Sequence, residues 1–284
     1  MPTTLSIAMI RREIGDDHIC LLTFDRPESG ANIFDAATLN ELDEHLDFVE
    51  SDTSLRGLII TSAKKSIFIA GADLKTLLKQ AQTGEMRDFI ADGQRILNRI
   101  AALEIPTVAA IHGACAGGGY EVTLACDWRI ATDDPATRIG LPETTLGLIP
   151  AWGGCTRLPR LIGPERAAEV ILKGKLYSAQ DALKLGLIDE ITSADRLVDL
   201  ARKKLRSGKR KMEGGAPATP SADSRELAPP IETENPASAR ALDVIKKGLA
   251  SSTDQSLALE LKAIVDLGKS ESTQNLIRNF FLGE

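Results

Sequence analysis

Short apolar runs alternate with helical patterns over the first two thirds of the chain. The apolar runs have the length and composition of strands, and the clearest are Leu5–Ile10, Ile19–Phe24, Leu58–Thr61 and Val108–His112. Between the second and the third run, apolar side chains recur at steps of three, four and three residues, at Leu39, Leu42, Leu46 and Val49. That spacing predicts one buried face of a helix, with Asp35 as its N-cap. Strands that alternate with helices are typical of an α/β layered fold.

Helical patterns also occur further along the chain. A helix is expected before Pro106, with its apolar positions at Phe89, Ile96, Leu97, Ile100 and Leu103. After Gly163 the pattern becomes mainly helical, and Pro164 suits a first helical turn. Ser178 is expected to cap a short helix that Gly186 ends, and another helix is predicted from about Ala194 to Leu205.

The composition changes at about residues 207–230. This stretch opens with the basic run Lys209, Arg210 and Lys211 and continues rich in Gly, Pro, Ser and Ala, which favours a solvated linker over a phosphate-binding site. A helical pattern returns near Ala237 and ends in an apolar tail at Leu282. We therefore expect a catalytic core over residues 1–192 and a helical C-terminal region over residues 193–284, with a flexible linker at about residues 207–230.

The composition narrows the function classes. The chain has 284 residues, of which 43% are hydrophobic and 26% charged, as in ordinary globular proteins. Forty acidic residues against thirty-four basic ones give a net charge of -6, which argues against general nucleic-acid binding because that requires a positive surface. Aromatic residues make up only 4%, which favours aliphatic packing over stacking platforms for bases.

Cysteine usage and the N-terminal sequence indicate a compartment. The four cysteines, Cys20, Cys115, Cys126 and Cys155, form no CxxC pair and have no histidine at metal-ligand spacing, so they are expected to be free thiols in a reducing environment. The first residues lack a basic start followed by a sustained apolar stretch, and no run approaches 18 apolar residues. We therefore expect a cytoplasmic protein without a membrane span.

A glycine-rich turn follows the last of the four predicted strands. The stretch HGACAGGGYEVTLAC runs from His112 to Cys126 and passes from a strand through Gly117, Gly118 and Gly119 into a helical pattern. Glycines let the backbone approach a ligand closely, and N–H groups at a helix start stabilise negative charge. A glycine-rich packing turn between a strand and a helix is the alternative interpretation.

A second junction of the same kind is IFIAGADLK, from Ile67 to Lys75. Two strand-to-helix junctions in one chain can each direct a backbone N–H group at the same oxygen atom. Such a pair of donors stabilises the enolate charge that develops on a thioester oxygen during conjugate addition.

Two carboxylates stand in apolar surroundings. Glu121 follows the glycines, and Glu143 lies in IGLPETTLGLIP, where an unpaired carboxylate is costly unless it is functional. Addition of water to an activated alkene needs one group that activates the water and one that delivers a proton to carbon, and two glutamates can divide these roles. The alternative is structural, with Glu121 as a charge near a helix N-terminus and Glu143 beside a helix cap.

Several motifs in a fixed order resemble one known family. GADLK, AGGGYE, GLPETTLGLIP and GGCTRLPRLIG, followed by AAEVILKGKLYSAQDALKLGLIDEI, resemble the crotonase superfamily, also called enoyl-CoA hydratase/isomerase. The resemblance covers about Leu5 to Thr192. More narrowly, ATDDPATRIGLPE and STQNLIRNFFL are similar to the N-terminal part of the multifunctional α-subunit of bacterial fatty-acid β-oxidation complexes.

The resemblance implies a fold and a set of site residues. The fold is a crotonase-like spiral of ββα turns, with a helical C-terminal region that covers the site or builds trimers. The implied oxyanion hole consists of the N–H groups of Ala72 and Gly118, while Glu121 activates water and Glu143 supplies the proton to the α-carbon. The substrate-binding residues that it implies are Ala70, Ala72, Asp73, Leu74, Lys75 and Gly118, with Lys75 as a partner for the phosphates of coenzyme A.

The implied activity is hydration of a trans-2-enoyl-CoA to a 3-hydroxyacyl-CoA in fatty-acid β-oxidation. The expectation is an enzyme that needs no metal and no redox cofactor, because coenzyme A is part of the substrate. Δ3-Δ2-enoyl-CoA isomerase activity is compatible with Glu143 alone, and a non-catalytic acyl-CoA-binding or assembly module is the alternative from another class. A serine hydrolase is disfavoured because no serine follows the glycine-rich turns.

Two features leave details open. Ala151 and Trp152 stand where the family has a glycine-containing PGxGG pattern, so the acyl pocket near Glu143 is expected to be reshaped. For partners, the resemblance is compatible with a homo-oligomer such as a trimer, or with association with a dehydrogenase or thiolase.

Overall fold

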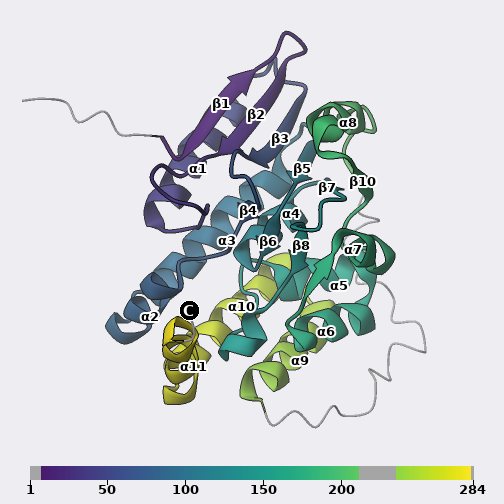
Figure 1. Ribbon diagram of the computed structural model, residues 1–284. Helices are drawn as coiled ribbons and strands as arrows, with labels where there is room; N and C mark the ends of the chain where they lie inside the picture. Colours follow the sequence, from purple (N-terminus) through teal and green to yellow (C-terminus); the bar gives the residue numbers. More distant parts are fainter. Residues whose placement is uncertain (1–7, 211–234, 283–284) are drawn as a thin grey trace, which may run out of the picture.

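Two sheets form the centre of the computed structural model, which describes residues 8–210 and 235–282 (Figure 1). The larger sheet has the order β1-β2-β3-β5-β7-β10 and consists of β1 (Ile10–Ile14), β2 (Ile19–Phe24), β3 (Gly57–Ser62), β5 (Thr107–Ile111), β7 (Trp128–Thr132) and β10 (Glu190–Thr192). The smaller sheet has the order β4-β6-β8-β9 and consists of β4 (Ile67–Ile69), β6 (Ala114–Ala116), β8 (Arg138–Gly140) and β9 (Leu176–Ser178). Neighbouring strands are parallel except in the pairs β1–β2 and β8–β9.

The order of the strands describes a spiral. Three times in succession the chain passes through a strand of the larger sheet, a strand of the smaller sheet and then a helix, in the series β3-β4-α2, β5-β6-α4 and β7-β8-η1. The helices of this series are α2 (Leu74–Thr83), α4 (Gly118–Ala125) and the short 3₁₀ helix η1 (Glu143–Leu146). This confirms the predicted spiral of ββα turns with a helical C-terminal region.

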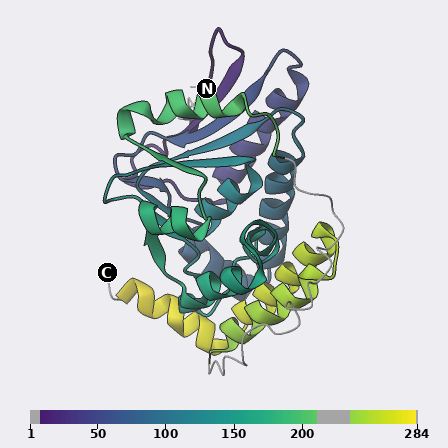
Figure 2. The same cartoon turned by 90° about the vertical axis from the view of Figure 1, so that its right-hand side faces the viewer.

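The middle of the larger sheet is buried on both faces. Every residue of β3 is buried, with Leu58 and Ile60 in the main core and Ile59 in a smaller cluster beneath α8 (Leu197–Leu205). Figure 2 shows α8, in green, lying across this second face of the sheet. A strand enclosed on both sides has a continuous apolar run in its sequence, which is why β3 could be predicted.

The two long helices predicted in the first half are confirmed. Helix α1 (Ala36–Ser51) buries the four predicted apolar positions, and the Asp35 side chain caps it by accepting a hydrogen bond from the Thr38 N–H at 2.8 Å. Helix α3 (Met86–Ala102) buries all the predicted positions within it, and Leu103 forms its C-cap.

The first strand differs from its prediction. A strand was expected at Leu5–Ile10, but β1 runs from Ile10 to Ile14, and residues 5–7 lie outside the described part of the chain. Only Ile10 is buried in β1, because β1 is an edge strand whose other side chains are exposed. An edge strand with a polar surface lacks the apolar run by which strands are recognised in a sequence.

The second half of the chain is mainly helical. Its helices are α5 (Gly154–Ile162), α6 (Pro164–Lys173), α7 (Ala179–Leu185), the 3₁₀ turn η2 (Ala194–Arg196), α8, α9 (Pro236–Leu249), α10 (Thr253–Gly268) and α11 (Glu271–Leu282). As predicted, Pro164 occupies the first turn of α6, and Ser178 and Gly186 bound α7. The helix expected from Ala194 to Leu205 is divided into η2 and α8.

The C-terminal helices lie against the end of the spiral. Helices α9 and α10 pack against α5, and α11 returns to contact η1 and α2 (Figure 1). The apolar tail is therefore docked on the core by its inner face, where Ile277 is buried, while Phe280 stays partly exposed. In the described ranges, no helix is long and apolar enough to cross a membrane.

The start of the predicted linker is held by the core. Lys209 Nζ lies 3.3 Å from Asp127 Oδ2, Arg210 pairs with Asp189, and the Arg210 guanidinium lies 4.4 Å from the centre of the Trp128 ring. The basic run therefore begins with residues that have acidic and aromatic partners on the protein. Residues 211–234, the rest of the predicted linker included, lie outside the described residues.

Candidate active site

Three strand ends of the smaller sheet meet at one edge. Strands β4, β6 and β8 are parallel neighbours, with Ile67 opposite Ala114 and Cys115 opposite Ile139. Because parallel strands end at the same edge of a sheet, the residues that come directly after them lie together there. Those residues are Ala70–Asp73, Gly117–Gly118 and Leu141–Glu143, which contain all the predicted catalytic and oxyanion residues except Glu121.

The turn after β4 is held from one side by the chain at residues 32–34. Asn32 O accepts from Ala70 N, Phe34 N donates to Gly71 O, and Asp73 N donates to Phe34 O, all at 2.8–2.9 Å. Phe34 thus pairs with the residues on either side of Ala72, and the Ala72 N–H is not part of this bridge. Asn32 is itself buried and donates to three acceptors, which fixes the segment.

The glycine turn presents the second N–H group. Gly117 has a φ of +54°, a conformation that favours glycine, and Gly118 is the first residue of α4, whose N–H has no partner within the helix. A methyl group added to Gly118 would lie 3.6 Å from the Ala72 nitrogen. In the described part of the chain neither N–H group has an acceptor, so two backbone donors lie side by side and available.

Glu121 lies one turn into α4 and is buried. Its Oε1 accepts hydrogen bonds from the backbone N–H groups of Trp152 and Gly154, both at 2.7 Å. Burial raises the pKa of Glu121 to about 7, while these two hydrogen bonds and the positive charge of Arg157 act in the opposite direction. Glu121 is therefore poised to change protonation near neutral pH.

Glu143 is the first residue of η1 and lies beside the glycine turn. A methyl group on Gly117 would be 2.8 Å from Glu143 Oε1, and Glu143 Oε2 is buried with no hydrogen-bond partner among the described residues. Burial raises the pKa of Glu143 well above its usual range, and the negative charge of Glu121 raises it further. Glu143 is thus the carboxyl group that keeps its proton when Glu121 has lost its own.

Together these features give one ionisable base, one protonated acid and two backbone donors around the same edge of the sheet. Two carboxyl groups whose environments separate their pKa values can act as base and acid in one reaction. The chemistry that fits is proton transfer combined with stabilisation of a developing oxyanion.

A model of the enoyl-CoA hydratase/isomerase family matches residues 15–217. The chain belongs to this family. Fatty acid oxidation complex subunit alpha from Shewanella baltica (strain OS185) is 35% identical in an alignment 281 residues long, which covers 94% of this chain and 40% of that protein. The protein of the same name from Shewanella sp. (strain MR-4) is 35% identical in an alignment 288 residues long, which covers 96% of this chain and 40% of that protein. The chain thus spans about 40% of the length of these curated relatives.

Solved structures agree with the family assignment. An enoyl-CoA hydratase from Bacillus halodurans superimposes with a TM-score of 0.75 at 27% identity, covering 96% of this chain and 100% of that chain. Human mitochondrial delta3-delta2-enoyl-CoA isomerase gives a TM-score of 0.73 at 25% identity, covering 97% of this chain and 98% of that chain. Both hydratases and isomerases of the family therefore share this fold.

The remaining predicted residues of this hydratase/isomerase chain lie at the start of α2. Ala70 and Lys75 are exposed, Leu74 packs partly against the core, and Lys75 Nζ lies 5.4 Å from the centre of the Phe281 ring of α11. Asp73 caps α2 by accepting hydrogen bonds from Lys75 N at 3.1 Å and from the Thr76 hydroxyl at 2.6 Å. Asp73 therefore shapes the turn at the start of α2.

Several other polar residues and all four cysteines have structural surroundings. His112 Nε2 lies 2.6 Å from Lys64 O, and Arg160 donates to Gly248 O and Ser251 O, which ties α5 to the end of α9. All four cysteines are buried free thiols, and burial raises the pKa of the Cys115 thiol well above its usual value. A thiolate nucleophile is correspondingly disfavoured at neutral pH.

Two further residues belong to the site: Trp152, which the sequence marked only as a departure from the family pattern, and Glu260, which was missed. Trp152 is buried with its ring against Gly118, and Glu260 of α10 accepts a hydrogen bond from Gly153 N at 2.8 Å across 107 residues of chain. Glu260 stands on the apolar face of α10, between the buried residues Leu257 and Ile264. An acidic residue on an apolar helix face is the signal that points to it.

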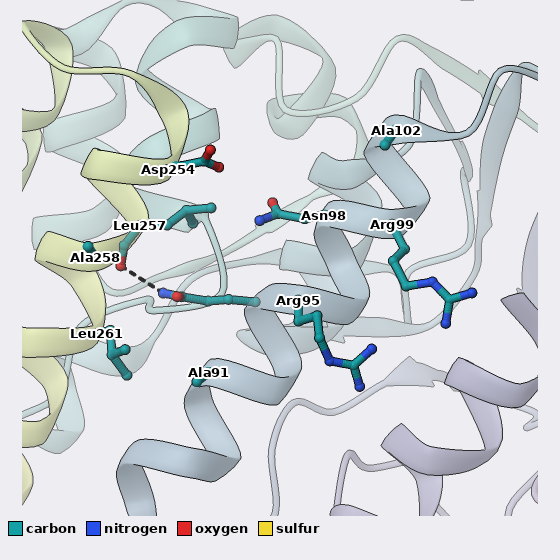
Figure 3. A pocket seen from close by; sticks show the side chains of 10 residues that line it. Ala91, Arg95, Asn98, Arg99, Ala102, Asp254, Leu257, Ala258 and Leu261 are labelled. Carbon is teal, nitrogen blue, oxygen red and sulfur yellow. Dashed lines mark hydrogen bonds between the residues drawn. The ribbon is translucent and has the colours of Figure 1, made fainter. Parts of the chain in front are cut away.

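A hollow of about 530 Å³ lies elsewhere, between α3 and α10, and includes none of the predicted site residues in its described lining (Figure 3). In Figure 3, Asn98 points from α3 towards α10, while Arg95 and Arg99 extend away from it and pair with Asp43 of α1. The Gln94 amide at the base of the hollow donates to Ala151 O and to Leu257 O. The hollow thus backs onto the loop that holds Glu121.

Proposed function

We propose that this chain is an enoyl-CoA hydratase that adds water to a trans-2-enoyl-CoA to give a 3-hydroxyacyl-CoA. The observation that carries the proposal is the grouping of Glu121 and Glu143 with the N–H groups of Ala72 and Gly118 at one edge of the smaller sheet, where neither N–H group has an acceptor among the described residues. Hydration needs a base, an acid and an oxyanion site, and these four residues supply one of each.

In the proposed reaction the Ala72 and Gly118 N–H groups hold the thioester oxygen and stabilise the enolate charge. The Glu121 carboxylate takes a proton from water as the water oxygen bonds to the β-carbon. The electron pair of the double bond moves towards the thioester, and the Glu143 carboxyl gives its proton to the α-carbon. Glu121 ends protonated and Glu143 ionised, so one proton must pass from Glu121 to Glu143, directly or through solvent, before the next cycle.

The coenzyme A part of the substrate is proposed to lie along the start of α2. Ala70, Asp73, Leu74 and Lys75 form this surface, and the exposed Lys75 ammonium offers a positive charge to the phosphates. The thioester activates its own alkene, and the proposed mechanism therefore requires no metal or redox cofactor.

Isomerisation of a Δ3-enoyl-CoA to the Δ2 isomer is the second candidate. It is favoured by the similarity to the human isomerase and by the buried Oε2 of Glu143, which has no partner among the described residues and can shuttle a proton alone. Hydration requires Glu121 as well, so a Glu121→Gln variant separates the two activities.

The wider setting is also a proposal. The names of the curated relatives, which refer to a fatty acid oxidation complex, support a role in fatty-acid β-oxidation. The proposal also places the chain in the cytoplasm, with a dehydrogenase or thiolase as partner or with copies of the same chain in a trimer, as the sequence resemblance implies. A non-catalytic acyl-CoA-binding module remains the alternative from another class, and turnover decides against it.

The test is the loss of the conjugated thioester absorbance with crotonyl-CoA and with a longer enoyl-CoA. We expect the wild-type chain to hydrate at least one substrate, and Glu121→Gln and Glu143→Gln each to reduce kcat by about 100-fold or more. Binding of crotonyl-CoA without turnover by a folded wild-type chain would contradict the hydratase assignment and favour the binding module.

A further inference from the structure

Three consecutive backbone N–H groups are shared between two buried glutamates. Glu121 of α4 accepts from Trp152 N and Gly154 N, and Glu260 of α10 accepts from the intervening Gly153 N at 2.8 Å. The two carboxylates belong to different layers of the molecule, since α4 lies in the spiral and α10 in the C-terminal region. The loop from residue 152 to residue 154 is therefore held by carboxylates from two separate elements.

The backbone conformation of residues 152–154 is restricted mainly by hydrogen bonds. Gly153 has a φ of +115° and forms the N-cap of α5, so the three N–H groups stand at a helix N-terminus where negative charge is favoured. Arg157 donates to Trp152 O at 2.9 Å, and a methyl group on Gly153 would lie 1.8 Å from Arg157 Nη1. The directions of the three N–H groups therefore depend on the carboxylates of Glu121 and Glu260 that accept from them.

The charges around Glu260 are unbalanced. Glu260 is fully buried, and the ionisable or charged groups that face it or its loop come from α4, η1 and α5; they are Glu121, Glu143, Cys155, Arg157 and Arg160. From α3, the uncharged side chains of Gln94 and Asn98 face the same loop. Glu121 and Glu260 thus share one buried guanidinium, that of Arg157, because Arg160 is only half-buried and bonds to α9 and the residues just after it.

These contacts give a role to Glu260, which takes no direct part in the proposed reaction. We propose that Glu260 is a positioning residue for the hydration reaction: by holding the Gly153 N–H it directs the Trp152 and Gly154 N–H groups at Glu121. The inference rests on the proposed function. Helix α10, which is remote in sequence, would thereby help to hold the water-activating carboxylate of Glu121 in place.

The hydrogen bond, not the charge, is the part of Glu260 that this role needs. Glu260 Oε1 is buried and has no hydrogen-bond partner in the described chain, so a glutamine can accept from Gly153 N equally well. Burial raises the pKa of Glu260 to about 8, and it is therefore largely neutral where Glu121, with a pKa of about 7, titrates. Glu260→Gln should preserve the function, whereas Glu260→Ala should release the loop.

The experiment compares Glu260→Ala, Glu260→Asp and Glu260→Gln with wild type by the pH profile of hydration. We expect Glu260→Ala to lower kcat about 10- to 100-fold, because a small misplacement of a catalytic group is costly. The acid limb of the pH profile of this variant should move to higher pH, because the Glu121 carboxylate loses hydrogen bonds that stabilise its ionised form. Glu260→Asp should show the same changes to a smaller degree, and Glu260→Gln should stay within about threefold of wild type at the unchanged pH midpoint.

Ser256→Ala is the matched control, because Ser256 is a buried residue of the same helix whose hydroxyl lies 2.8 Å from the Thr156 hydroxyl and, among the described residues, forms no hydrogen bond with residues 152–154. It should lower the melting temperature while kcat per folded enzyme and the pH midpoint stay as in wild type. If Glu260→Ala behaves like Ser256→Ala, with stability reduced but kcat and pH midpoint unchanged, Glu260 is only structural and the proposal fails.

A second readout separates this proposal from the proposed function. The titration of the Glu121 carboxyl carbon can be followed by ¹³C NMR and assigned by its absence in Glu121→Gln, with no substrate present. A higher midpoint in Glu260→Ala than in Glu260→Gln supports the positioning role even if wild type hydrates nothing. Identical midpoints in both variants overturn the positioning role whatever the activity.

Discussion

The indole ring of Trp152 occupies the space that the missing side chain of Gly93 leaves on α3. A methyl group on Gly93 would lie 2.2 Å from the Trp152 indole nitrogen, a distance that no side chain can adopt. The rings of Phe34 and Phe89 also contact the indole, each with its centre 5.5 Å away. The ring is thus enclosed by neighbours that fix its place beside Gly118.

Gly93→Ala is expected to destabilise the fold. Alanine favours a helix over glycine by up to about 1 kcal/mol, but the overlap with the buried indole costs about 1–3 kcal/mol and forces the ring to move. We expect a net loss in the free energy of unfolding, measured by urea denaturation, and a lower hydratase rate because Trp152 is linked to Glu121.

Gly30→Ala is the matched control, because a methyl group there meets no heavy atom within 4 Å. Its free energy of unfolding should stay within about 0.5 kcal/mol of wild type. Equal stability of the Gly93 and Gly30 variants would show that the indole ring moves freely and is not held by α3.

Elements with a local signal could be predicted from the sequence. The run ICLLTF, the cap Asp35 and the stop Gly186 all have such signals, and the structure confirms each of them. The junctions that hold Ala72 and Gly118 were also recognisable, because each combines an apolar strand with a turn, whereas Glu143 was recognisable as a carboxylate in apolar surroundings. These junctions meet because β4, β6 and β8 are parallel neighbours, an order that no single motif states.

Features that depend on contacts between distant segments could not be predicted in this way. Glu260 reaches Gly153 across 107 residues, and Asn32 donates to Phe68 O across 36. Both are polar side chains whose burial is decided by tertiary packing, not by propensity. The pKa of Glu121 likewise depends on burial and on N–H groups more than 30 residues away.

The hydration rate should depend on the ionisation of Glu121. Burial raises its pKa to about 7, and only the carboxylate can take a proton from water. The value of kcat/KM for crotonyl-CoA should therefore fall as pH is lowered through 7, by about tenfold per pH unit further down. Measurement between pH 5.5 and pH 8.5 checks this, with the residual rate of Glu121→Gln as the control that should lack this limb. A rate that stays constant down to pH 5.5 would contradict the assignment of Glu121 as the base.

Stability should also depend on pH through the buried glutamates. The pKa of Glu260 is raised from its usual value of 4.5 to about 8, so between these pH values the folded protein holds a proton that the unfolded chain has lost. The free energy of unfolding is therefore highest below pH 4.5 with respect to this group. It falls as pH rises through the window, by about 1.4 kcal/mol per pH unit, and levels off above pH 8.

The side chain in Glu260→Gln cannot titrate. The free energy of unfolding of this variant, measured by urea denaturation from pH 5 to pH 7.5, should therefore fall less steeply with pH than that of wild type, by about 1.4 kcal/mol per pH unit. Ser256→Ala removes no titratable group and should keep the wild-type slope. The same slope in wild type and Glu260→Gln would mean that Glu260 does not carry a raised pKa in the folded protein.

Trp152→Leu is expected to change the acyl-chain preference. A methyl group on Gly118 would lie 2.6 Å from the Trp152 ring, so under the proposed function the ring lies beside the atoms that react. A smaller apolar side chain leaves room for one or two further methylene groups, and at about 0.8 kcal/mol each their burial should raise the ratio of kcat/KM for decenoyl-CoA over crotonyl-CoA by about 4- to 15-fold. Because the prediction concerns a ratio, any loss of active protein cancels.

Trp128→Leu makes the same substitution on β7, beside Lys204 and Arg210, and should leave the ratio unchanged. If Trp152→Leu also leaves it unchanged, the indole ring does not bound the acyl site, and chain length is selected elsewhere.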